Sequence, residues 1–120
     1  MNYHESSSED SQRMCEELER SLSTKIPNLK RSVAQQWCSL NQLGRSKFVY
    51  IKHRKRTGGL ELWCMGKPSD LQAHTKLAIR ERQPSSGGFS ERFQARVKVE
   101  SMNYVEEIAD MLLQVSYKVS

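Results

Sequence analysis

The chain has 120 residues, of which 37 % are hydrophobic and 28 % are charged, enough for one domain and too few for two ordinary ones. No apolar run approaches the roughly 20 residues that a membrane-spanning helix needs, so we expect no membrane partner. The net charge of +5 is unevenly distributed, because residues 1–20 carry −4 and residues 21–120 carry +9. An excess of positive charge favours polyanionic partners.

The first ten residues contain no aliphatic side chain after the initial methionine. We therefore predict a disordered acidic tail over residues 1–10 and a single α+β domain over residues 11–120. The tail has neither the basic start nor the apolar run of a signal peptide. An odd number of cysteines without a CxxC pair indicates buried thiols in a reducing compartment, so we expect a cytoplasmic protein. These cysteines are Cys15, Cys38 and Cys64.

Apolar residues at helical spacing predict an amphipathic helix over residues 11–22, which Pro27 brings to an end. Residues 33–40 are ambiguous. Gln35 and Gln36 favour a helix, whereas Trp37 and its β-branched neighbours permit a strand. We interpret this segment as a first strand.

Residues 47–54 are dense in aromatic and β-branched side chains and predict a strand. The pair Gly58-Gly59 supplies the positive φ angles of a hairpin turn, and residues 60–65 form the return strand. Leu62 faces one side of this strand and Trp63 the other, which predicts a central rather than an edge position.

Residues 66–70 predict a turn, residues 71–74 one helical turn and residues 77–82 another strand. A flexible loop over residues 84–88 leads to a strand over 92–100, where apolar and basic side chains alternate. A helix is predicted over residues 103–119, with a capping box formed by Asn103 and Glu106. Its expected buried residues are Tyr104, Val105, Ile108, Leu112, Val115 and Val119. The expected fold is α+β, with a mostly antiparallel sheet of four to five strands, an N-terminal helix and a packed C-terminal helix.

Catalytic and metal-binding motifs are absent from the sequence. The histidines stand apart from other ligand residues, and neither glycine pair matches a nucleotide-binding loop. Cys64 would need His53 or His74 beside it to act as a nucleophile, and its place on the core face argues against this. Only Glu61 and Glu100 are strand carboxylates that could be neighbours, without the Lys of an E-x-K nuclease site. We therefore expect no cofactor, no metal and no catalytic residue.

The remaining candidate is a basic sheet face that binds the phosphates of DNA or RNA, with aromatic side chains that stack on unpaired bases. Its predicted basic residues are Lys47, Lys52, Arg54, Lys55, Arg56, Arg80, Arg82, Arg92, Arg96 and Lys98. Its predicted aromatic residues are Tyr50, Trp63, Phe89 and Phe93.

Other interpretations stay open at this point. The lysines and arginines can simply keep an outer sheet face soluble, with the aromatic residues in the core. The acidic tail and first helix can instead dock on a protein partner or form a homodimer. A small hydrolase with an unrecognised site is the third alternative.

The hairpin Lys47–Met65, the later basic strand and the ending Tyr104-Val105-Glu106-Glu107-Ile108 with Tyr117 resemble a small uncharacterised bacterial domain. That domain is of the predicted transport or nuclease-associated type. The resemblance covers the last two-thirds of the chain and rests on the order of elements. It implies an α+β fold and an accessory role, and it supplies no site residue.

Overall fold

The computed structural model describes residues 9–33, 37–54, 58–81 and 93–118, with side chains from residue 11 onward. Its elements are α1 (Glu9–Lys25), β1 (Leu29–Val33), β2 (Cys38–Gln42), β3 (Val49–His53), β4 (Leu60–Cys64), α2 (Pro68–Leu71), the 3-10 turn η1 (Gln72–His74), β5 (Ile79–Glu81), β6 (Ala95–Val99), the 3-10 turn η2 (Met102–Tyr104) and α3 (Val105–Tyr117).

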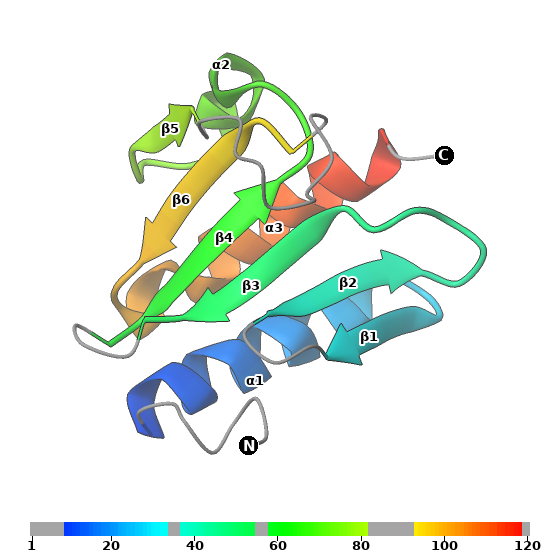
Figure 1. The fold of residues 1–120 in the computed structure, drawn as a ribbon, viewed down its shortest axis with the longest axis horizontal. Helices are drawn as coiled ribbons and strands as arrows, with labels where there is room; N and C mark the ends of the chain where they lie inside the picture. The colour runs from blue at the N-terminus through cyan, green and yellow to red at the C-terminus, as the bar shows by residue number, and fades with distance from the viewer. Residues whose placement is uncertain (1–8, 34–36, 55–57, 82–92, 119–120) are drawn as a thin grey trace.

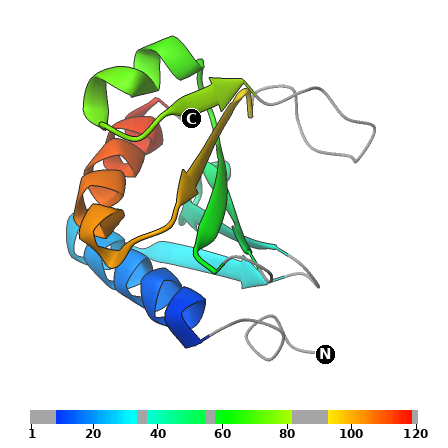
Figure 2. The ribbon, with the colours of Figure 1, turned by 90° about the vertical axis from the view of Figure 1, so that its left-hand side faces the viewer.

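The six strands form one antiparallel sheet in the order β1-β2-β3-β4-β6-β5 (Figure 1). The long helices α1 and α3 lie side by side across one face of this sheet (Figure 2). No described helix covers the opposite face. The α+β class, the N-terminal helix and the packed C-terminal helix are therefore confirmed.

The core lies between the sheet and the two helices because alternate residues of the central strands point towards α1 and α3. In β4 these are Leu60, Leu62 and Cys64, all fully buried. Leu18 of α1 and Ile108 of α3 meet them from the helix layer. The alternation gives the sheet a second face whose side chains point away from the core. None of the described helices is long and apolar enough to cross a membrane.

The predicted hairpin of residues 47–65 is confirmed as β3 and β4, with Tyr50 opposite Trp63 and His53 opposite Leu60. The central position of β4 is also confirmed, because it pairs with β3 on one side and β6 on the other. Gly59 adopts a φ of +81°, as the predicted hairpin turn requires.

The expected number of strands was too low, because residues 29–42 form two strands rather than one. β1 ends at Val33 and β2 begins at Cys38, and these residues are paired in an antiparallel hairpin. β1 is an edge strand whose side chains are mostly exposed and polar. Exposed edge strands do not alternate clearly between apolar and polar residues, so the sequence pattern did not reveal this one.

The boundaries of both long helices differ from prediction. α1 begins at Glu9, inside the predicted tail, and continues to Lys25. The predicted capping box is wrong, because η2 precedes α3 and the Ser101 hydroxyl accepts the bond from the Asn103 amide at 3.2 Å. Tyr104 is exposed, not buried. The buried residues Val105, Ile108, Leu112 and Val115 are confirmed, whereas residues 1–8, 84–88 and Val119 lie outside the described part of the chain.

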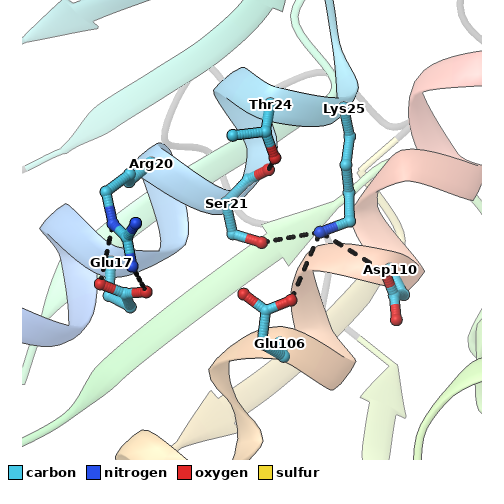
Figure 3. Close-up of polar contacts among 7 residues, drawn as sticks. All are labelled: Glu17, Arg20, Ser21, Thr24, Lys25, Glu106 and Asp110. Carbon is cyan, nitrogen blue, oxygen red and sulfur yellow. Dashed lines mark hydrogen bonds and ion pairs between the residues drawn. The ribbon is translucent and has the colours of Figure 1, made fainter.

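Lys25 joins the end of α1 to the start of α3 (Figure 3). Its Nζ lies 2.8 Å from Ser21 Oγ, 3.4 Å from Glu106 Oε2 and 3.8 Å from Asp110 Oδ1. A cation at the C-terminus of α1 and the carboxylate of Glu106 in the first turn of α3 both suit the helix dipoles. Hydrogen bonding from Ser21, followed by Lys25, lowers the pKa of Glu106.

Hydrogen bonds to the Glu107 carboxylate link α3 to the segment before β5. Its Oε2 accepts hydrogen bonds from Thr75 Oγ1 at 2.6 Å and from the Lys76 amide at 2.8 Å. These bonds, the one from Thr75 first, lower the pKa of Glu107 below its ordinary value of 4.5. The carboxylate therefore stabilises the fold above pH 4.5, and this contribution is lost as the pH falls through the lowered folded-state pKa.

We predict that Glu107→Gln destabilises the protein at neutral pH and reduces the loss of stability on acidification. An amide keeps one acceptor oxygen but does not titrate, so its contribution does not change below pH 4.5. The measurement is the midpoint of thermal unfolding across the acidic range. Glu16→Gln, at an exposed position of α1, is the control. An acid dependence of Glu107→Gln equal to that of the wild type would contradict the prediction.

Candidate nucleic-acid interface

The sheet face opposite α1 and α3, called here the open sheet face, is defined by the strand register. Directly opposed residues of antiparallel strands share a face. One row across the sheet contains Ser39, Tyr50, Trp63, Arg96 and Arg80. The next row contains Lys52, Glu61 and Lys98. Aromatic and basic residues predicted from four strands therefore share one face.

Four aromatic rings pack together on this face and form the aromatic cluster. The ring centroids of Trp37 and Trp63 are 4.4 Å apart, and those of Tyr50 and Phe93 are 4.8 Å apart. Trp37 meets Tyr50 edge to face at 6.4 Å, which connects the two pairs. Phe93 is buried, whereas the other three rings are partly exposed. The cluster thus offers aromatic surface to solvent while its rings hold one another in place.

Two lysines lie over rings of the aromatic cluster. Lys52 Nζ is 5.5 Å from the centroid of the Trp37 ring, and Lys47 Nζ is 5.8 Å from that of Tyr50. Both distances fall within the range of cation–π attraction, which extends to about 6 Å. Positive charge is therefore held directly beside the aromatic surface.

Glu61 fixes the position of one of the rings. The indole Nε1 of Trp63 donates a hydrogen bond to Glu61 Oε2 at 3.0 Å. Lys98 lies opposite Glu61 on β6 and shares its face. This carboxylate therefore orients Trp63, and it lowers the positive charge of the open sheet face by one unit.

The edge of the open sheet face at β5 and β6 is hollowed. The hollow has a volume of about 210 Å³ and is lined by Leu77, Ala78, Arg80, Arg96, Lys98 and Glu100. Arg96 lies directly opposite Trp63, so the hollow adjoins the aromatic cluster. Three of the lining residues, Arg80, Arg96 and Lys98, are cations. Glu100 Oε1 is 3.2 Å from Nη1 of a different cation, Arg54.

The structure brings most of the predicted residues together. Tyr50, Lys52, Trp63, Arg80, Arg96 and Lys98 are on the open sheet face, with Lys47 beside Tyr50 and Arg54 paired to Glu100. Phe93, predicted as a stacking residue, is instead buried against Tyr50. The remaining predicted site residues, Lys55, Arg56, Arg82, Phe89 and Arg92, lie outside the described residues.

Trp37 and Lys30 also lie on the open sheet face and were not predicted as site residues. Lys30 is opposite Asn41, in the part of the edge strand that was not predicted. A signal for Trp37 was present, because Cys38 and Leu40 are buried and strand alternation then places Trp37 on the other face. Locating the start of β2 correctly would have revealed it.

The residues considered for catalysis are separated in the fold. Cys64 is paired with Val49 of β3. Val49 and His53 are four residues apart on that strand, which corresponds to about 13 Å. Burial raises the pKa of Cys64 to about 12, which disfavours a thiolate nucleophile. His74 is exposed on η1. No group of three or more His, Cys, Asp or Glu side chains in the described residues is arranged to hold a metal ion.

The three cysteines form no disulfide bond and are buried, as predicted. Cys15 and Cys38 lie on the helix side of the sheet, where each Sγ is near Glu19 Oε1, at 3.5 and 3.6 Å. Burial, with smaller effects from Cys15 and Glu19, raises the pKa of Cys38. Thiols in such surroundings are unreactive and pack as small apolar groups.

Comparison of the chain with models of known protein families, with curated proteins and with solved structures found no match. The resemblance to a small bacterial accessory domain therefore stays a prediction.

Proposed function

We propose that this protein binds single-stranded nucleic acid through its open sheet face and performs no catalysis. The observation that carries the proposal is the aromatic cluster. Trp37, Tyr50 and Trp63 present partly exposed rings on a face that no described helix covers, with Lys52 and Arg96 beside them.

Aromatic rings of this kind suit unpaired bases. Stacking of one base on an aromatic side chain contributes about 1–3 kcal/mol and tolerates any base, because every base has a π-face. Aromatic residues on an open antiparallel sheet recur as platforms for single-stranded RNA. In a duplex the faces of the bases are occupied by their neighbours, so a single strand is the preferred ligand.

The basic residues suit the backbone of the same ligand. Lys52, Arg96 and Lys98 border the aromatic cluster from two strands, and Arg80 extends the positive region to the sheet edge. Such residues bind phosphates by releasing condensed counterions, which makes the affinity depend strongly on salt. A face that only served solubility would not need two partly exposed tryptophans beside these cations.

The protein's own tryptophan fluorescence can be used to follow binding, because its two tryptophans both belong to the aromatic cluster. We expect single-stranded RNA or DNA homopolymers to quench tryptophan fluorescence. The logarithm of the affinity should fall linearly with the logarithm of salt concentration, by about 0.7 for each phosphate neutralised. A duplex of matched length should bind more weakly and quench less.

Two outcomes would count against the proposal. The first is the absence of any fluorescence change at low salt. The second is an affinity that does not depend on salt, which would favour a protein partner or a homodimer on this face.

A further inference from the structure

The hollow at the β5–β6 edge concentrates like charges within the sheet. Arg80 and Arg96 are directly opposed on the open sheet face, and Lys98 is the next residue of β6 on that face. Like charges directly opposite each other destabilise a pair of strands. All three line the same hollow of about 210 Å³. This arrangement is unfavourable unless an anion lies between the cations.

The carboxylates near the hollow offset only part of its charge. Glu100 is the one acidic residue among the described residues of the lining, and its Oε1 is 3.2 Å from Arg54 Nη1. Glu61 is directly opposite Lys98 on this face and also accepts the hydrogen bond of Trp63, so it offsets one of the three cations.

Arg96 supplies an independent indication of a missing partner. Its Nε is buried and has no hydrogen-bond partner among the described residues. Buried donors are nearly always hydrogen-bonded, and an unmade bond from a charged group is more costly than one from a neutral group. The unsatisfied Nε leaves Arg96 with a donor for phosphate, an anion that guanidinium groups bind well.

We propose that this hollow is a phosphate-binding subsite, held by Arg80, Arg96 and Lys98, of the single-strand interface. The inference rests on the proposed function and assigns a role to one end of that interface. Trp63 lies opposite Arg96 on the adjacent strand, about 5 Å away. A phosphate in the hollow would therefore be next to a base that stacks on the aromatic cluster.

The test begins with inorganic phosphate alone. A ligand that binds only the folded state raises the unfolding temperature. Phosphate should stabilise the wild type relative to chloride at equal ionic strength, and Arg80→Gln and Arg96→Gln should each lose this effect. Lys118→Gln, which removes a cation next to α3 on the helix side, should keep it. In chloride, Arg80→Gln should unfold no earlier than the wild type, because it removes the repulsion with Arg96.

A second arm uses the tryptophan signal. Arg96→Gln should weaken single-strand binding about tenfold, as expected for the loss of one charged hydrogen bond. Short single strands with and without a 5′-phosphate identify the source of the bound group. A preference for the phosphorylated strand that disappears in Arg80→Gln indicates a terminal phosphate, and equal affinities indicate a backbone phosphate.

The possible outcomes distinguish failure of the phosphate subsite from failure of the proposed function. Single-strand binding that is equally tight in Arg80→Gln, Arg96→Gln and wild type, without phosphate stabilisation, overturns the subsite and leaves the proposed function standing. Phosphate stabilisation that depends on both arginines, without any single-strand binding, supports the anion site and overturns the proposed function. Equal phosphate stabilisation of all the variants also overturns the subsite.

Discussion

Replacing Trp63 with Ala is expected to weaken single-strand binding by about 1–3 kcal/mol, the contribution of one stacked base. Trp63 is central to the aromatic cluster, since it packs on Trp37, is opposed to Tyr50 and is oriented by Glu61. The loss should appear at every salt concentration with an unchanged salt dependence, because no cation is removed. Fluorescence anisotropy of a labelled single strand measures it.

Two further variants make this prediction specific. Tyr117→Ala removes an aromatic ring that is 65 % exposed on α3, away from the open sheet face, and should bind like the wild type. Trp63→Phe keeps an aromatic face and should retain most of the affinity. Circular dichroism shows whether each variant is folded. Full affinity in a folded Trp63→Ala, or an equal loss in Tyr117→Ala, would place binding elsewhere on the molecule.

Gly59→Ala is expected to destabilise the fold by about 2–5 kcal/mol, which combines left-handed backbone strain with a steric overlap. Gly59 has a φ of +81°, and an added Cβ would lie 2.4 Å from the carbonyl oxygen of Val99 on β6. The same turn is bound to α1, because the Ser11 hydroxyl donates to the Gly59 carbonyl at 3.0 Å. Urea denaturation measures the effect.

The neighbouring glycine provides a matched control. Gly58 has a φ of +76°, but its Cβ would meet no atom of the described residues within 4 Å. Gly58→Ala should therefore cost only the backbone strain, about 1–2 kcal/mol. Equal destabilisation by the two substitutions would show that the close approach of the β3–β4 turn to β6 is not a determinant of stability.

The parts of the fold that depend on local sequence were predictable. Residues 47–65 carry dense β-branched and aromatic side chains around a Gly-Gly turn, and this pattern was sufficient for β3 and β4. The opposition of Tyr50 and Trp63 follows from the same hairpin. β1 carried no comparable signal, since Lys30, Arg31 and Ser32 give it exposed polar side chains on both faces.

The arrangement of the candidate site depends on pairing between distant segments. β6 lies between β4 and β5, so Arg96 is adjacent to Trp63, 33 positions earlier in the chain. Local patterns show which residues alternate along one strand, but they do not determine which strand becomes its neighbour. The basic strands were therefore recognised in the sequence, while their common face became evident only from the sheet register.

The most direct measurement of the central proposal is an NMR titration of isotopically labelled protein with a short single strand. Binding through the open sheet face predicts that the two indole N–H signals and the amides of β3, β4 and β6 shift first. The amides of α1 and α3 should change little. Shifts confined to the helices, or no shifts at low salt, would contradict the account.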